Sequence, residues 1–388
     1  MRGEETSPVR VRVPGRQATE YEVRIERGIF RELAALCRRA APAHRYAIIA
    51  DSKVASLYGR PALEAFGEPR EGAASGAGLF SFPAGEWNKT SEEWARLSDE
   101  LAAEGFGRDG AIVALGGGVT GDLAGFVAAT YMRGVALVQV PTSLLAMLDS
   151  SIGGKTGLDT LEAKNLLGAF HQPRLVLIDP ELLRSLPTFQ LASGLAEAVK
   201  AGAIADERLF GWMESHAAGL LNRDVDLLTE LIRRSVAIKA AVVEQDPLED
   251  GLREILNFGH TIGHALEALG GYEVLHGEAV ACGMRLEARL GELLGVTREG
   301  PADRLRGLLE ACALDRQVEE EFTAEQVLKA ARGDKKVRGS VIRCVLLSRI
   351  GEVATAAGGG HAHRIPPDRE LELLEMALRS KGGSADCG

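Results

Sequence analysis

Three histidines and one glutamate have the residue types and spacing of a divalent-metal site. His260 and His264 are four residues apart in a segment of helical character, so their imidazoles point to the same side of a helix. His276 follows twelve residues after His264, and a loop that folds back could add its ring. Glu197 is the best candidate for an acidic ligand. Two neutral imidazoles and one carboxylate, with a fourth position open, form the ligand set of a catalytic zinc centre.

The histidine spacing alone leaves alternatives open. Histidine pairs at helical spacing are more often solvated or structural than bound to metal, and the residues do not decide whether His260 or His264 would be the ligand. Hydrogen-bond donors that lie near the histidines in the sequence, or follow later, are Lys239, Arg253, Asn257 and Lys336.

Length and composition indicate an ordinary globular protein with two domains. The chain has 388 residues, of which 46% are apolar and 26% charged, and it contains no apolar run long enough to span a membrane. The polar N-terminus predicts no export signal, and five scattered cysteines suit a reducing cytoplasm better than a disulfide framework or a Cys-built zinc site. A net charge of -10 disfavours nucleic acid as a partner.

The first half of the chain predicts an α/β domain, and the second half a mainly helical one. Apolar strands alternate with helices, which is typical of a parallel sheet covered on both faces. After Pro187 the pattern becomes helical and rich in Ala and Leu. We therefore expect a first domain over 1–182, a helical domain over 183–355, and a tail over 356–388 with a possible short helix. The predicted strands lie at 9–13, 21–25, 46–51, 111–115, 135–140 and 175–180.

Two strand ends in the first domain are candidate ligand sites. The strand 111–115 runs into Gly116, Gly117 and Gly118 and then a helix, a context in which exposed amide groups can hold a pyrophosphate. The alternative is a tight structural turn. Asp51 ends another strand, where it could contact a ligand or cap the next helix.

A second glycine-rich segment resembles a nucleotide-binding P-loop only in part. Gly154-Lys155-Thr156 lacks both the first glycine of that motif and a preceding strand, so we reject the P-loop interpretation. The donors around it suit a phosphate or a carboxylate, although each one alone could be a solvated surface residue. These donors are Arg133, Lys155, Lys164 and Asn165.

At these residues the chain resembles the 3-dehydroquinate synthases, within the wider sugar-phosphate cyclase family. The resemblance runs from about residue 44 to 350 and depends on eight motifs in the same order. Two segments depart from the family pattern: 186–191 lacks an Arg-Glu pair, and 159–163 lacks the common Pro and Gly. The matching motifs lie at 85–90, 116–122, 149–156, 164–165, 194–200, 257–264, 275–280 and 334–337.

The resemblance implies a Rossmann-like N-terminal domain that binds NAD, a helical domain that binds one divalent metal (zinc or cobalt), and an active site in the cleft between them. It assigns the metal to Glu197, His260 and His276, which settles the choice that the spacing left open. The NAD contacts that it implies are Asp51, Glu86, Lys89, Gly117, Gly118, Val119, Thr120, Gly121, Asp122, Thr142, Ser143, Lys155, Lys164, Leu182 and Ser185.

The implied reaction is that of a phosphorus-oxygen lyase. It converts 3-deoxy-D-arabino-heptulosonate 7-phosphate to 3-dehydroquinate and phosphate, a step of the shikimate pathway to aromatic amino acids. The family is expected to act as a cytoplasmic homodimer, with Arg133 reaching the site of the neighbouring subunit. The residues that the resemblance places around the anionic substrate are Arg133, Asp149, Lys155, Asn165, Lys200, Lys239, Arg253, Asn257, His264 and Lys336.

Other activities remain as alternatives. A sister cyclase would act on sedoheptulose 7-phosphate, an amino analogue or glucose 6-phosphate, but the combination of Lys164, Asn165, Arg253 and Asn257 favours a substrate with both a carboxylate and a phosphate. A metal-dependent polyol dehydrogenase of related fold would release NADH. A non-enzymatic NAD-binding scaffold would make the metal and anion ligands incidental.

Overall fold

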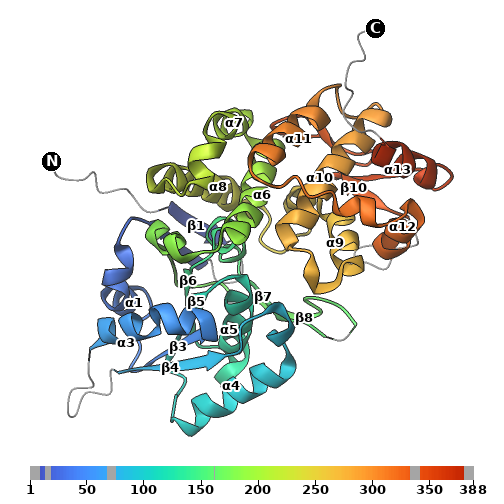
Figure 1. Ribbon diagram of the computed structural model, residues 1–388. Helices are drawn as coiled ribbons and strands as arrows, with labels where there is room; N and C mark the ends of the chain where they lie inside the picture. The colour runs from blue at the N-terminus through green and yellow to red at the C-terminus, as the bar shows by residue number, and fades with distance from the viewer. Residues whose placement is uncertain (1–8, 14–18, 68–75, 161, 333–340, 380–388) are drawn as a thin grey trace. The chain divides into compact units, whose positions relative to one another are not determined.

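A seven-stranded sheet forms the centre of the first half of the chain (Figure 1). Its strand order is β1-β2-β9-β6-β5-β3-β4, in which β1 pairs antiparallel with β2 and all other neighbours are parallel. The predicted parallel sheet is thus confirmed, with one antiparallel strand at its edge. The strands are β1 (Val9–Val13), β2 (Thr19–Ile25), β3 (Tyr46–Asp51), β4 (Ala77–Phe82), β5 (Ala111–Gly116), β6 (Ala136–Pro141) and β9 (Leu175–Ile178).

Helices cover both faces of this sheet. Side chains alternate across a strand, so Tyr46 and Ile48 pack with α1 (Leu33–Ala40) and α3 (Arg60–Phe66) in one core cluster. Ala47 and Ile49 pack in a second cluster on the opposite face. The helices of that cluster are α4 (Ser91–Ala103) and α5 (Gly118–Thr130).

The structure, a computed structural model, describes residues 9–13, 19–67, 76–160, 162–332 and 341–379. The chain divides into two units. The first comprises Met1–Leu186 and Leu228–Pro247, and the second comprises Pro187–Leu227 and Leu248–Gly388. Most of helix α8 (Val225–Gln245) therefore belongs to the first unit.

The sequence did not indicate a hairpin that follows β6. The segment from Thr142 forms only a short helical stretch ending in η5 (Ala146–Ser150), after which β7 (Lys155–Leu158) pairs antiparallel with β8 (Leu167–Phe170). A side chain at Gly168 would place its Cβ 2.5 Å from the carbonyl oxygen of Thr156. Glycine at position 168 thus allows the two strands to approach closely.

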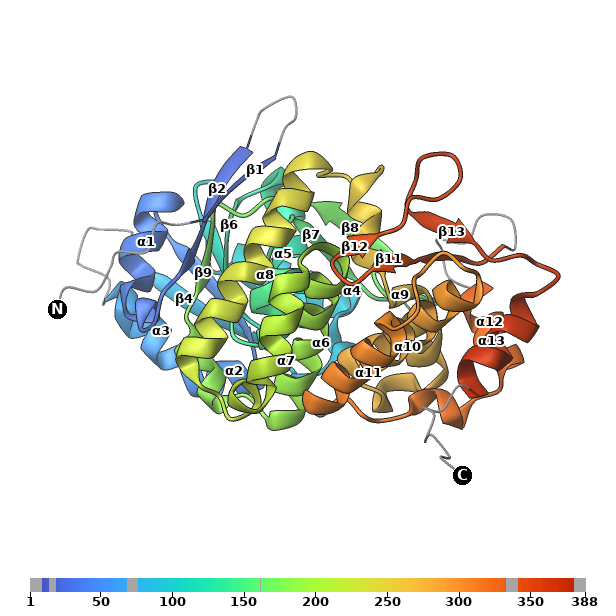
Figure 2. The same ribbon diagram turned by 90° about the horizontal axis from the view of Figure 1, so that it is seen from above.

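The second unit is mainly helical, as predicted, and its core lies around α9 and α10 (Figure 2). Ile262, Leu266 and Leu286 are buried there together with Leu373 from α13. Among the described residues, no helix is both long and apolar enough to cross a membrane. The helices are α6 (Thr188–Ala205), α7 (Glu207–Leu221), α9 (His260–Leu269), α10 (His276–Leu293), α11 (Pro301–Ala311), α12 (Ala324–Arg332) and α13 (Glu370–Arg379).

The end of the described chain is built into this second core. Strand β13 (Ala362–Arg364) pairs antiparallel with β10 (Arg343–Val345), and α13 buries Leu373 and Leu374 among the residues of α10 and α12. The predicted short helix near the C-terminus therefore exists and contributes to packing. Two further short strands, β11 (Leu347–Arg349) and β12 (Glu352–Val353), pair with each other.

Candidate active site

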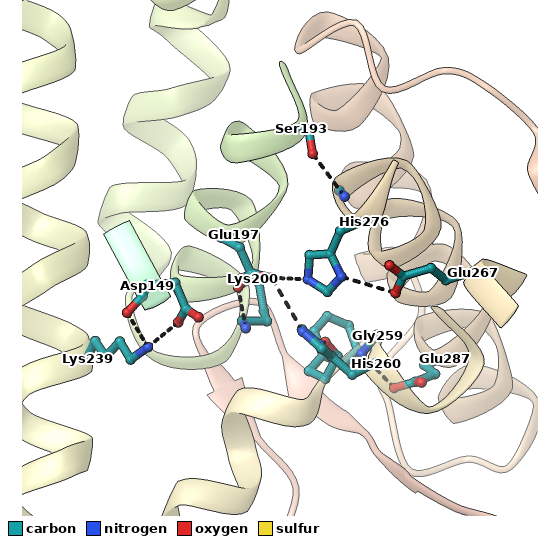
Figure 3. Close-up of polar contacts among 12 residues, drawn as sticks. Asp149, Ser193, Glu197, Lys200, Lys239, Gly259, His260, Glu267, His276 and Glu287 are labelled. Carbon is teal, nitrogen blue, oxygen red and sulfur yellow. Dashed lines mark hydrogen bonds and ion pairs between the residues drawn. The ribbon is translucent and has the colours of Figure 1, made fainter. Parts of the chain in front are cut away.

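Glu197, His260 and His276 converge in the second unit (Figure 3). The Nε2 atoms of His260 and His276 lie 3.4 and 3.6 Å from Glu197 Oε1. The two imidazole ring centroids are 5.4 Å apart. One ligand atom from each residue lies within 4.8 Å of the others, so the three side chains could hold one metal ion.

Helix α6 supplies the carboxylate from an unusually buried position. All its residues from Leu191 to Ile204 are buried, as expected for a helix that is apolar or small on every side. Glu197 and Lys200 are the ionisable exceptions in that stretch, and at a spacing of three residues they form an ion pair. The sequence thus places a charged pair where surrounding apolar side chains exclude water.

The two histidines lie at the N-termini of their helices. His260 is the first residue of α9 and His276 is the first residue of α10. The positive end of a helix dipole disfavours a cationic imidazolium. Neutral imidazole is the form that binds a metal, so the helix dipole by itself favours the ligand state at both positions.

Hydrogen bonds at the other ring nitrogen orient both imidazoles. His260 Nδ1 lies 3.1 Å from the carbonyl oxygen of Phe258, and His276 Nδ1 lies 3.3 Å from Glu267 Oε2. With the proton on Nδ1 in each ring, Nε2 carries the lone pair and faces Glu197. A carboxylate or carbonyl behind a histidine is the usual arrangement in metal sites.

The charges of this cluster fit a divalent cation. Glu197 is only 4% exposed, and neither carboxylate oxygen accepts a hydrogen bond of regular geometry from the described residues. Burial acts to raise the pKa of Glu197, but Lys200 and then His260 hold that pKa well below its usual value. A buried anion beside two imidazole ring nitrogens is a favourable environment for a cation.

The pKa values of the histidines differ because their neighbours differ. Burial, followed by the positive charge of Lys200, lowers the pKa of His260 to about 4. Burial also acts to lower the pKa of His276, but the neighbouring carboxylates of Glu197 and Glu267 outweigh this and raise the pKa to about 10. His260 is therefore ready to bind a cation, whereas His276 must lose a proton first.

His264 lies one helical turn from His260, with ring centroids 5.2 Å apart. Together with Glu267 and His276 it forms a second group whose ligand atoms lie within 4.8 Å of one another. The two groups share His276 and differ in whether His260 or His264 is a member. The structure thus contains both of the alternatives that the sequence left open. The second group is less buried because it lacks a residue like Glu197.

In the first unit, carboxylates of the described residues surround the buried side chain of Lys89. Its Nζ lies 2.9 Å from Glu86 Oε1, 3.2 Å from Asp122 Oδ2 and 3.5 Å from Asp159 Oδ1. Burial lowers the pKa of Lys89, but these carboxylates outweigh it and raise the pKa above its usual value. Burial raises the pKa of Asp122 to about 6, against the opposing effect of Lys89. The structure thus brings together three of the predicted NAD contacts, Glu86, Lys89 and Asp122.

Asp159 was missed by the sequence analysis, and it lies beside Asn165. The side-chain oxygen of Asn165, which the resemblance placed at the substrate, accepts a hydrogen bond from Lys89 at 2.8 Å. Its backbone N–H donates to Asp159 Oδ1 at 2.7 Å. Asp159 begins the segment that departs from the family pattern, and that departure was the only signal available in the sequence.

The strand ends of the first unit form helix N-termini. Asp51 accepts hydrogen bonds from the N–H groups of Lys53 and Val54 at 2.9 and 3.1 Å, so the capping alternative is confirmed. Gly117 is the N-cap of α5, and Gly118 is its first residue. A Cβ on Gly118 would lie 3.2 Å from Ser150 Oγ, so glycine keeps this turn open. The remaining predicted residues of this strand-turn-helix region are Val119, Thr120 and Gly121 in α5, with Thr142 and Ser143 after β6.

Leu182 and Ser185 lie in η6 (Pro180–Ser185) and line a cavity of about 470 Å³ in the first unit. The hydroxyl of Tyr58 lies 2.7 Å from Ser185 Oγ and donates to the carbonyl oxygen of Leu182 at 3.2 Å. Phe30 and Gly28 also line the cavity. Tyr58 and Phe30 carried no motif, so the sequence analysis missed them.

The other predicted site residues fall into several environments. Lys239 contacts Asp149 Oδ1 at 2.6 Å within the first unit. In the second unit, Arg253 is buried and Asn257 donates to Glu249 Oε1 at 3.2 Å. Arg133 and Lys155 are exposed, Lys164 is half-buried, and Lys336 lies outside the described residues.

Comparisons with known proteins decide the family. Residues 79–193 match the family described as 3-dehydroquinate synthase N-terminal, and residues 194–337 match its C-terminal counterpart. A 3-dehydroquinate synthase from Symbiobacterium thermophilum is 47% identical over 336 residues, which is 86% of this chain and 92% of the relative. The chain belongs to the 3-dehydroquinate synthase family. The resemblance read from the eight motifs is thereby confirmed.

Solved structures of sister enzymes share the fold. A 2-deoxy-scyllo-inosose synthase complexed with carbaglucose-6-phosphate, NAD⁺ and Co²⁺ superposes with a TM-score of 0.85 at 25% identity, over 96% of this chain and 99% of the other. The 2-epi-5-epi-valiolone synthase of Streptomyces hygroscopicus subsp. jinggangensis 5008, with NAD⁺ and Zn²⁺ bound, gives a TM-score of 0.83 at 29% identity. That alignment covers 95% of this chain and 99% of the other.

The Lys89 cluster generates a prediction about stability. Replacing the buried Lys89 with methionine leaves one buried carboxylate, that of Asp159, and two partly buried ones without their cation, and we expect the free energy of unfolding to fall by about 3 kcal/mol. K89M/D122N removes one of these carboxylates and should recover part of that loss. Denaturant unfolding of the three proteins measures both effects, and a K89M protein as stable as wild type would contradict the described arrangement.

Proposed function

We propose that this chain is a 3-dehydroquinate synthase, which converts 3-deoxy-D-arabino-heptulosonate 7-phosphate to 3-dehydroquinate and phosphate. The observation that carries the proposal is the convergence of Glu197, His260 and His276 in a chain of this family. The sister cyclases differ in substrate, and 47% identity to a 3-dehydroquinate synthase supports the substrate named here.

The proposed metal site comprises Glu197, His260 and His276, with one position left for substrate. The burial of Glu197 and the orientation of both Nε2 atoms support this set over the group that contains His264. Zinc or cobalt suits these ligands. His264 would then donate a hydrogen bond to a substrate hydroxyl beside the cation.

NAD is proposed to bind to the first unit at the N-terminus of α5, with the Lys89 cluster and the cavity beside Ser185 contributing contacts. When bound, NAD would supply a hydride acceptor and the divalent cation a Lewis acid, so that a substrate alcohol can be oxidised transiently. The resulting ketone would acidify the hydrogen on the neighbouring carbon, and phosphate would leave from the carbon beyond it. The backbone N–H groups of α5 offer donors to the pyrophosphate. The remaining residues proposed to contact NAD are Asp51, Glu86, Asp122, Thr142, Ser143, Lys155, Lys164 and Leu182.

The chain's own residues are proposed to bind and orient the substrate. A buried guanidinium such as Arg253 can hold a carboxylate through two parallel hydrogen bonds. Lys239 is held by Asp149 at 2.6 Å, which orients its ammonium group. Fixing a flexible sugar phosphate in one conformation lowers the entropic cost of ring closure. The other proposed substrate contacts are Lys155, Asn165, Lys200, Asn257 and Lys336.

The experiment that tests the activity measures phosphate and NADH together. Purified protein, the heptulosonate phosphate and a trace of NAD should release phosphate without net formation of NADH, because the hydride returns to the substrate. A chelator should abolish phosphate release, and added zinc or cobalt should restore it. Steady accumulation of NADH would indicate a dehydrogenase, and turnover of sedoheptulose 7-phosphate or glucose 6-phosphate instead would indicate a sister cyclase.

Two matched variants separate the two metal groups. E197Q removes a charged ligand from the proposed site and should lose both bound metal and turnover. H264N should retain stoichiometric metal while phosphate release falls by about 100-fold or more, because a positioned donor is lost. Elemental analysis after dialysis measures the metal content. A metal-free H264N and a metal-loaded E197Q would show that the cation uses the other group.

We also propose that the protein acts as a dimer in which Arg133 completes the partner's site. Arg133 is exposed in a turn with a positive φ of 68°, next to exposed Met132, so its guanidinium is accessible to a second copy of the chain. R133A and E197Q should each be inactive alone. The two variants are then mixed in equal amounts, unfolded and refolded so that subunits pair at random. Half of the dimers should contain one subunit of each kind, and one of their two sites has both Glu197 and Arg133 intact. The mixture should therefore recover about a quarter of wild-type activity. No recovery would mean that Arg133 acts within its own chain.

A further inference from the structure

A second fully buried glutamate lies close to the metal-site helices and has no role in the proposed chemistry. Glu287 is on α10, eleven residues after His276, and is 0% exposed. Glutamate is almost never buried completely unless its charge is satisfied. Here the partners are backbone groups. Glu287 Oε2 accepts from the N–H of Gly259 at 2.7 Å (Figure 3). Its Oε1 accepts from the N–H of Ile262 at 3.1 Å.

These N–H groups belong to the first turn of α9, which begins at His260. The first N–H groups of a helix have no partner within the helix, and a capping side chain normally satisfies them. The N-cap of α9 is Gly259, with a left-handed φ of 79°, and glycine has no side chain to do this. Glu287 therefore caps α9 from a different helix, and its two hydrogen bonds fall on either side of His260.

Backbone contacts make this arrangement rigid. A Cβ on Gly283 would lie 1.9 Å from the carbonyl oxygen of Gly259, and a Cβ on Gly259 would lie 2.9 Å from the backbone nitrogen of Met284. Helices α9 and α10 thus touch main chain to main chain at the turn that carries His260. Little room remains for that turn to rotate while both hydrogen bonds to Glu287 are in place.

We propose that Glu287 is a positioning residue that aims His260 Nε2 at the cation. The His260 ring takes its direction from the same turn, because its Nδ1 bonds to the carbonyl oxygen of Phe258 at 3.1 Å. Since His276 begins α10 itself, Glu287 links the two histidine ligands through one helix. This inference depends on the metal site of the proposed function and adds the residue that sets its geometry.

The test is cobalt binding, which needs neither substrate nor NAD. E287Q keeps the shape of the side chain but replaces one acceptor with an NH₂ group that faces a backbone N–H. We expect its affinity for Co²⁺ to fall about 10–100-fold, the usual effect of losing a group that orients a ligand. The visible absorption of bound Co²⁺ should also change in position or intensity, because the direction of one nitrogen ligand changes.

The chain offers a matched control in Glu370, another buried glutamate of the second unit. Its Oε1 accepts from the backbone N–H of Ile342 at 3.3 Å, and it belongs to α13. E370Q makes the same chemical change at a carboxylate whose described partners are Arg332 and Ile342 rather than the first turn of α9, so it should lower thermal stability while leaving the Co²⁺ affinity and spectrum unchanged. Equal losses of Co²⁺ affinity in E287Q and E370Q, or none in E287Q, would overturn the proposal.

Two further measurements keep the outcomes separate. If E287Q does not fold, E287D retains the carboxyl group but shortens its reach by one methylene, and the proposal then requires weaker Co²⁺ binding by E287D. H260N should bind Co²⁺ poorly in any case. If H260N loses Co²⁺ binding while E287Q binds Co²⁺ like the wild type, the role of Glu287 is refuted and the proposed function stands. A wild-type protein that binds no Co²⁺ would overturn both proposals.

Discussion

A carboxylate buried inside α6 requires compensating positive charge, and the second unit is arranged around that requirement at Glu197. The side chain is 4% exposed, and its oxygens accept no regular hydrogen bond from the described residues. Lys200 supplies one cation, and the Nε2 atoms of His260 and His276 face the carboxylate. Without such partners, the desolvation of an ionised carboxylate would be too costly for this position.

Hydrogen bonds between helices connect α6, α9 and α10, which carry Glu197, His260 and His276. Ser193 of α6 accepts a hydrogen bond from the N–H of Gly277 in α10 at 3.0 Å, and a Cβ on Gly277 would lie 2.1 Å from the carbonyl oxygen of Ser193. Glu287 joins α10 to α9 in a similar way. Small residues at these crossings let the backbones touch, so the positions of the ligands follow from helix packing.

The sequence predicted more of the architecture than of the contacts. Alternating strands and helices indicated the parallel sheet, because side-chain periodicity is a local property. The choice between His260 and His264 was not local, since both project from one face of α9 and only the position of α6 distinguishes them. The family motifs, rather than the spacing, gave the assignment.

Residues that act through tertiary contacts escaped the sequence analysis. Asp159 reaches Lys89 only because the hairpin of β7 and β8 folds back, and that hairpin was not predicted. In the sequence, nothing distinguishes Glu287 from an ordinary glutamate of an amphipathic helix. Its hydrogen bond to Gly259 spans 28 residues of the chain. The hydroxyl groups of Tyr58 and Ser185 are in contact although the two residues are 127 positions apart in the sequence. No pattern within a helix or strand encodes such pairs.

The central claim is that one divalent cation binds where α6, α9 and α10 meet. The most direct test is an anomalous difference map at the zinc absorption edge, from crystals grown with stoichiometric zinc. The account predicts a single peak about 2.0–2.2 Å from Glu197 and from the Nε2 atoms of His260 and His276. A peak bonded instead to His264, Glu267 and Nδ1 of His276, with Glu197 bound only to Lys200, would contradict it.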